Sequence, residues 1–275
     1  MEHASLASSA AAAHAGLHAD PSEHAPQPSF WPILLAGGMG AVVFFVFLVY
    51  LGVPLAGILL AAAILGSLVA ASGWANTIAV ERRRMDPVQT NKDLTRGFFF
   101  FLASEAMIFV SYFEYLYYTH FTSAQWPPAG MPRLETTLPG IATLILVGSS
   151  FTLNWGIHAF LSGRKSAAKN WILLTIAMGI VFLGMQGFEW GFLNGVMGFT
   201  ITTGAYSAAY FLMTGFHGAH VTVGLIMLGL VYWRMEKGEY TQQYHMSLKA
   251  AEYYWHFVDI VWVFLFFSLY LFQGH

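Results

Sequence analysis

Residues 97–120 read GFFFFLASEAMIFVSYFEYLYYTH, a long apolar and aromatic run whose first carboxylate, Glu105, lies about two helical turns from its start. A membrane-spanning helix needs roughly 20 mainly apolar residues, so this run is long enough to cross a bilayer. An acid at that depth costs about 2.5–3.5 kcal/mol on insertion scales and normally faces protein, a lipid headgroup or water. Glu105 is therefore the first candidate for a functional residue. A structural hydrogen bond that joins two helices is an equally good interpretation of this stretch alone.

The composition extends the membrane interpretation to the whole chain. Of its 275 residues 57% are hydrophobic, 17% are aromatic and only 9% are charged, against about 25% charged residues in soluble domains. A membrane protein with several spans is the class that fits. The formal net charge of −2 argues against nucleic acid as a partner. Cysteine is absent, which excludes disulfides, iron–sulfur clusters and thiolate-bound zinc or copper.

Seven apolar segments predict an all-α membrane protein with seven transmembrane helices. They occupy residues 31–51, 55–78, 97–118, 138–161, 171–193, 206–233 and 250–271. Gly52-Val53-Pro54 joins the first two in a tight hairpin, and a polar connection containing the run ERRR separates that hairpin from the other five helices. The predicted organisation is a cytoplasmic His-rich tail at 1–30, a two-helix hairpin at 31–80, a basic cytoplasmic connection at 81–96 and a five-helix bundle at 97–275.

The positions of lysine and arginine predict the orientation, because short cytoplasmic loops are enriched in these residues. Five cations follow the second segment, three follow the fourth and three follow the sixth, whereas Arg133 stands alone on the other side. We therefore expect the N-terminus in the cytoplasm. The odd number of helices then places the C-terminus outside, which is the periplasm for a bacterial plasma (inner) membrane.

The first 30 residues contain no Lys or Arg, so they lack the basic start of a signal peptide, and they lack its apolar middle as well. We interpret them as an exposed tail. Imidazoles change charge near neutral pH, and the tail holds four of them: His3, His14, His18 and His24. They could bind a metal weakly, although a solvated tail is the simpler interpretation. We also consider that they collect protons.

Titratable side chains inside the helices predict a buried polar network. His217 and His220, three residues apart, could ligate a metal or a haem, but we favour hydrogen bonds across helices. His256 and Asp259 follow Glu252 on one face of the last helix, where they could relay protons, bind a cation or form a fixed packing network. The remaining members of the predicted network are His158, Gln186 and Glu189.

Several of these stretches together resemble subunit III of the haem–copper cytochrome c oxidases. The matching pieces are Ser104-Glu105, Trp126-Pro127-Pro128 with Gly130, His158-Ala159-Phe160, Gln186 with Glu189, the run TGFHGAHV at 214–221 and the run YWHFVD at 254–259. The last two are long and specific, and the resemblance extends over residues 31–271. Two departures are Ile157, where the family usually has the first of two histidines, and Lys249, where an acid is common.

The resemblance implies an accessory subunit of an aa3- or caa3-type oxidase that receives electrons from cytochrome c. We expect it to pack against subunit I, with haem and copper in the partner subunits I and II and none bound by this chain. The first two helices are expected to splay from the other five and leave a V-shaped cleft for bound phospholipid, with Glu105 in that region and Arg234 and His245 at lipid headgroups. The resemblance further implies support of proton uptake through the D pathway of subunit I and protection from inactivation during turnover.

Other functions fit less well. Subunit III of a quinol oxidase usually keeps only five helices, so the extra hairpin favours the cytochrome c branch. A retinal protein would need a lysine within its seventh helix, and Lys249 lies only at the edge. A stand-alone proton-coupled transporter could use Glu105 and Glu189, but we find no convincing internal repeat of the kind that transporters often show. A membrane di-metal oxidase would normally have denser clusters of ligands.

Overall fold

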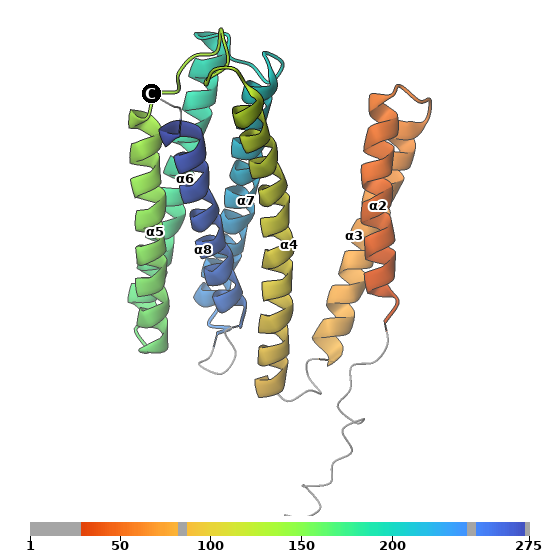
Figure 1. Ribbon diagram of the computed structural model, residues 1–275. Helices are drawn as coiled ribbons and strands as arrows, with labels where there is room; N and C mark the ends of the chain where they lie inside the picture. The colour runs from red at the N-terminus through yellow and green to blue at the C-terminus, as the bar shows by residue number, and fades with distance from the viewer. Residues whose placement is uncertain (1–28, 82–86, 241–245, 273–275) are drawn as a thin grey trace, which may run out of the picture. The chain divides into compact units, whose positions relative to one another are not determined.

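The computed structural model describes residues 29–81, 87–240 and 246–272 (Figure 1). Over these residues the chain is helical and forms no strand. Its elements are α2 (Trp31–Tyr50), α3 (Ala56–Glu81), α4 (Pro87–Thr122), α5 (Thr137–Leu161), α6 (Lys165–Gly195), α7 (Ala205–Glu236), α8 (Met246–Phe266) and the π-helical turn η3 (Phe267–Leu271). Within the described ranges, 7 helices are long and apolar enough to cross a membrane. The predicted all-α membrane fold with seven transmembrane helices is confirmed.

The chain divides into two compact units, Met1–Lys92 and Asp93–His275. The first unit contains the hairpin of α2 and α3, and the second contains nearly all of α4 together with α5 to α8. The phospholipid cleft expected between the hairpin and the bundle stays a prediction.

Small residues let α2 and α3 pack closely in the hairpin unit. A Cβ added to Gly38 would lie 2.5 Å from Ser67 Oγ, and one added to Gly73 would lie 2.5 Å from the ring of Trp31. Such small-residue contacts are a common way for helices to associate in membranes. The turn between the helices uses Gly52 in the left-handed region, with φ of 71°. None of the residues of α2 is fully buried within the unit, and apolar side chains such as Val43 and Phe44 stay 72% and 56% exposed.

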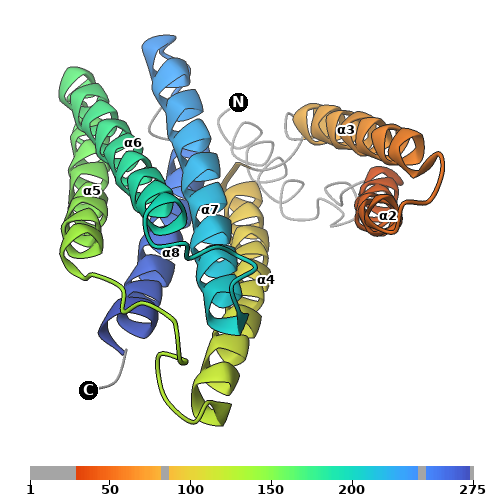
Figure 2. The same ribbon diagram turned by 90° about the horizontal axis from the view of Figure 1, so that it is seen from above.

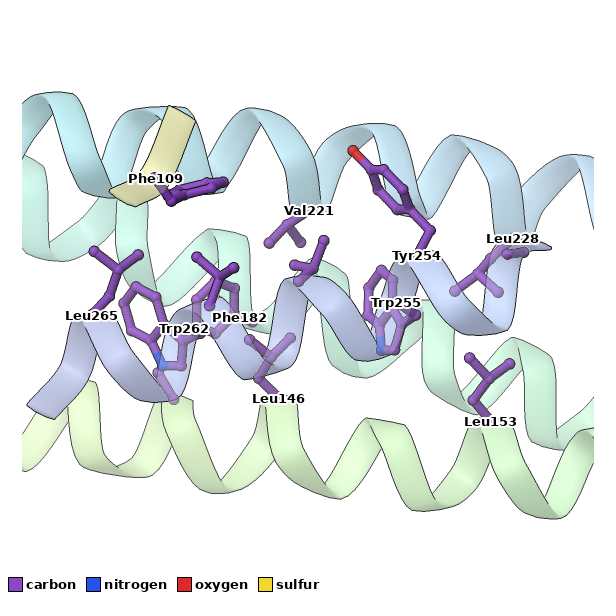
Figure 3. Packing of buried hydrophobic residues seen from close by; sticks show 14 of the residues in the cluster. Phe109, Leu146, Leu153, Phe182, Val221, Leu228, Tyr254, Trp255, Trp262 and Leu265 are labelled. Carbon is purple, nitrogen blue, oxygen red and sulfur yellow. The ribbon is translucent and has the colours of Figure 1, made fainter. Parts of the chain in front are cut away.

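The bundle unit is built around α8, which packs against α5 and α7 (Figure 2). Trp255 and Trp262 of α8 are both fully buried in the hydrophobic core (Figure 3). The ring of Trp255 fits between Gly179 of α6 and Gly224 of α7, where an added Cβ would lie 2.7 and 2.8 Å from ring atoms. Its indole N–H donates to Ser149 Oγ of α5 over 2.8 Å. One side chain of α8 thus depends on the close approach of three other helices.

Two helices, α4 and α6, begin more than one helical turn before their predicted starts. α4 begins at Pro87 rather than at residue 97, and α6 begins at Lys165 rather than at residue 171. Hydropathy locates only the apolar part of a helix, whereas polar residues continue the same helix beyond the bilayer. Pro87 suits a first helical position because its missing N–H would have no partner there. The polar start of α6 is also tied to α7 by an ion pair of 2.8 Å between Lys169 Nζ and Glu236 Oε1.

Candidate functional site

The acid that the sequence singles out, Glu105 on α4, contacts His220 on α7. Glu105 Oε2 lies 3.0 Å from His220 Nε2, and the other ring nitrogen, Nδ1, lies 2.8 Å from the carbonyl oxygen of Phe216. The side chains of His220 and Glu105 are 10% and 20% exposed. The pair therefore connects α4 to α7, as expected if Glu105 joins two helices.

The hydrogen bonds of this pair determine how many protons it holds. A backbone carbonyl only accepts, so Nδ1 of His220 carries a hydrogen and donates it to Phe216. The contact between Nε2 and the carboxyl group then needs at least one proton, and one is enough whether it is on the ring or on Glu105, because two unprotonated atoms would face each other with lone pairs. Both arrangements leave the pair without net charge. A neutral pair avoids much of the cost of charge in a low-dielectric interior.

Aromatic rings enclose the histidine of this pair. The ring of Phe109, which is buried, lies 5.1 Å from that of His220, and the ring of Phe216 lies 4.9 Å away. Tyr254 stacks on the imidazole at 6.2 Å with an interplanar angle of 11°. These contacts hold the imidazole in one orientation. His220 thus contacts α4 through a hydrogen bond between helices, and its place in a functional network stays a prediction.

His217, three residues earlier, has different surroundings. It is fully buried between Phe182 and Trp262, whose ring centroids lie 5.7 and 4.9 Å from its own. Over the described ranges neither ring nitrogen has a hydrogen-bond partner, so the bond predicted for this histidine is not found. No group of three or more His, Asp or Glu in the described part of the chain could hold a metal ion.

A second polar group joins α6, α7 and η3 near the Gly195 end of α6. The hydroxyl of Tyr270 donates to Glu189 Oε2 over 3.0 Å. Because that hydroxyl has a single hydrogen, the contact of 3.0 Å between the hydroxyls of Tyr210 and Tyr270 is a bond donated by Tyr210. Glu189 and Gln186, one turn earlier, are both buried as predicted. The two tyrosines thus form a directed chain that ends on a buried carboxyl group.

A third polar group contains His256 and Asp259 of α8 together with Ser150 of α5. Ser150 donates its hydroxyl hydrogen to Asp259 Oδ2. His256 Nδ1 lies 2.8 Å from the same hydroxyl oxygen and is therefore the donor to it. The sequence places His256 and Asp259 on one face, and the structure connects them through a serine from another helix.

For one member of the predicted buried network, His158, the prediction of burial is wrong. His158 is exposed although Ile157 and Ala159 beside it are buried, because its side chain lies on the outer face of α5. Arg234, predicted at a lipid headgroup, donates from Nε to Glu239 Oε2 over 2.8 Å and lies 5.2 Å from the ring centre of Tyr240. His245 lies outside the described residues, as do the tail histidines His3, His14, His18 and His24.

Sequence reasoning missed the hydroxyl partners Ser150, Tyr210 and Tyr270. Each meets its polar partner from a different helical element, so no spacing along the chain relates the two. A weak signal exists only for Tyr270, which lies about three turns after Asp259 on α8 and η3 and so falls near the same face.

Comparisons with known proteins point to one family. The family model described as Cytochrome c oxidase subunit III matches residues 22–274. The chain is 42% identical over 177 residues to cytochrome c oxidase subunit 3 of Synechocystis sp., covering 64% of this chain and 74% of the relative. It is 32% identical over 260 residues to the subunit 3 of Mycosarcoma maydis, covering 90% and 93%. It is 38% identical over 176 residues to that of Thermostichus vulcanus, covering 64% and 85%. The chain therefore belongs to the cytochrome c oxidase subunit III family.

Proposed function

We propose that this chain is an accessory subunit of an aa3- or caa3-type cytochrome c oxidase that binds no redox centre itself. It stabilises the haem-bearing subunit I, holds phospholipid and supports proton uptake at the D pathway while the complex reduces oxygen. Its partners are subunits I and II, membrane phospholipids and, for the whole complex, cytochrome c. Membership of the family supports the place in the complex. The observation that carries the more specific role is the Glu105–His220 pair.

The geometry of that pair favours stabilisation over proton relay. With a single proton in the contact the pair is neutral, and adding or removing a proton would leave a net charge among Phe109 and Phe216. Leaving an uncompensated charge in such surroundings costs several kcal/mol. Glu105 nevertheless keeps 20% of its side chain exposed, which leaves room for a lipid beside it. We therefore place the pair as a neutral joint between α4 and α7 at a lipid-facing surface.

The test compares Glu105→Ala with Glu105→Gln in the purified oxidase. Alanine removes the bond to His220 and should hasten inactivation during turnover while the haem spectra stay unchanged. Glutamine can still donate an N–H to Nε2, so it should behave like the unsubstituted enzyme if the joint is what matters. Glu114→Ala on the same helix is the matched control, because Glu114 is exposed. Unchanged inactivation in Glu105→Ala would contradict the proposal, and loss of assembly would make the role of Glu105 purely structural.

The lipid contacts at the ends of the helices rest on Arg234 and His245. The side chain of Arg234 remains 41% exposed beside Glu239, and its NH1 lies 3.3 Å from Ser247 Oγ. A guanidinium that is positioned but still accessible suits a phosphate headgroup. The clustering of cations on one side supports an N-terminus in the cytoplasm of a bacterial cell and a C-terminus in the periplasm.

Two other functions remain as outcomes of one purification. A tag on this chain should bring down larger subunits with haem and copper. Oxidation of quinol but not of cytochrome c by that complex would indicate subunit III of a quinol oxidase. A solitary colourless protein would indicate a stand-alone proton-coupled transporter.

A further inference from the structure

A surface pocket of about 450 Å³ lies where α5 ends and α6 begins. It is lined by Trp155, His158, Ala159, Arg164 and Trp171. The two helices run side by side in the bundle unit (Figure 1). None of the lining residues is an acid, and Lys165 follows directly in the sequence. The pocket is therefore suited to an anion.

The turn between the two helices places Arg164 at this pocket. Gly163 has φ of 79°, its N–H donates to the carbonyl of Phe160 over 2.9 Å, and the N–H of Arg164 donates to the carbonyl of Ala159 over 2.9 Å. A left-handed glycine with these two bonds is a Schellman motif, which ends α5 in one defined geometry. Arg164 follows as the residue that precedes the first turn of α6. No hydrogen bond or ion pair joins its guanidinium to another side chain in the described part of the chain.

The other side of the pocket is an indole pair. Gly156 lets the helices approach, since a Cβ added there would lie 3.2 Å from Cβ of Trp171. The rings of Trp155 and Trp171 consequently lie 5.1 Å apart. Tryptophan is enriched at the depth of lipid headgroups, where its ring contacts apolar chains and its N–H contacts polar groups. Phe151 and Leu174, one turn farther into the bilayer, are 58% and 43% exposed and continue the apolar surface.

We propose that this pocket binds an acidic glycerophospholipid, with its phosphate at Arg164 and its upper acyl chains along Trp155 and Trp171. A guanidinium matches phosphate with paired hydrogen bonds, and His158 adds a further ring N–H. Basic pockets between transmembrane helices are suited to anionic headgroups. The apolar surface that continues from the pocket favours a lipid over free phosphate. The lining of this pocket does not include Arg234 or His245, for which lipid contacts are proposed above. The proposal does not depend on a role of the subunit in proton uptake.

The experiment uses the purified oxidase complex in nanodiscs of phosphatidylcholine that contain a trace of phosphatidylglycerol with a photoreactive acyl chain. After illumination, the cross-linked positions are mapped by peptide mass spectrometry. We expect the photoreactive lipid to cross-link to peptides within residues 151–174. An excess of unlabelled phosphatidylglycerol should abolish these cross-links by competition. In Arg164→Gln, about ten times more phosphatidylglycerol should be needed for the same competition, because one charge-assisted hydrogen bond to the phosphate is lost. Lys165→Gln removes the neighbouring charge, which is not part of the pocket lining, and should leave the competition by phosphatidylglycerol unchanged.

Several results would overturn the proposal. An equal weakening of the competition in Arg164→Gln and Lys165→Gln would indicate that the lipid is attracted only by diffuse surface charge. Competition by inorganic phosphate as strong as that by phosphatidylglycerol would indicate a site for free anions. An unaltered cross-link in Arg164→Gln would exclude the phosphate contact. Should Arg164→Gln fail to assemble, Trp155→Leu provides the second test, because it keeps every charge and should still lower the cross-link yield in a complex with normal haem spectra.

Discussion

Replacement of Gly224 by alanine tests how tightly the core of the bundle is packed. A Cβ at this position would lie 2.8 Å from Cε3 and 3.0 Å from Cζ3 of Trp255. The ring has little room to move away, since it is fully buried and faces Gly179 on the opposite side. A displaced ring would also lose its hydrogen bond to Ser149.

The expected cost follows from comparison with a control on the same helix. A Cβ on Gly229 would meet nothing within 4 Å. Both substitutions gain the same helix preference of alanine over glycine, up to about 1 kcal/mol. Their difference therefore reports only the contact with Trp255. Overpacking of a well-filled core costs about 1–3 kcal/mol, so Gly224→Ala should be less stable than Gly229→Ala by that amount.

The measurement is unfolding of the chain in detergent micelles by sodium dodecyl sulfate, followed by far-UV circular dichroism. Gly224→Ala should unfold at a lower fraction of dodecyl sulfate than Gly229→Ala. In a Trp255→Leu background, which removes the ring, the difference should shrink to a few tenths of a kcal/mol. Equal stability of the two alanine variants in the original background would refute the close packing of Trp255 against α7.

Three further predictions concern polar contacts. Tyr270→Phe removes the donor to the buried Glu189 and should lower the free energy of unfolding by about 1–3 kcal/mol, whereas Tyr210→Phe leaves that bond in place and should cost less. An equal cost of the two substitutions in the same unfolding assay would contradict the assignment of Tyr270 as the donor. Lys169→Gln breaks an ion pair whose side chains are 25% and 46% exposed, so it should change stability by at most about 1 kcal/mol, with an effect that disappears in high salt; a loss that persists there would contradict this reasoning. Deletion of residues 1–24 should slow steady-state turnover of the oxidase at alkaline pH, where protons are scarce and collecting imidazoles matter most; an unchanged pH dependence would rule out the proton-collecting tail.

The positions of the helices followed from composition because a bilayer imposes one length and one polarity on every span. All seven predicted segments lie within observed helices or reach a few residues beyond them, and the larger errors are the polar starts of α4 and α6. Those starts have no hydropathy signal, since residues outside the bilayer are free of its constraint. The prediction that His158 is buried failed for a different reason. The sequence shows that this residue lies in the last turn of α5, but its exposure depends on how α6 packs beside it.

The sequence by itself determined the membrane class and the number of spans and singled out Glu105 as a candidate, because each depends on the cost of placing one residue type in hydrocarbon. It could not assign partners to the polar groups. Glu105 pairs with His220, 115 positions along the chain, and Ser150 joins His256 and Asp259 from 106 and 109 positions away. Only the packing of α4, α5, α7 and α8 brings these side chains within hydrogen-bonding distance. The pocket at Arg164 likewise exists only because Gly156 and the turn at Gly163 bring two helix ends together.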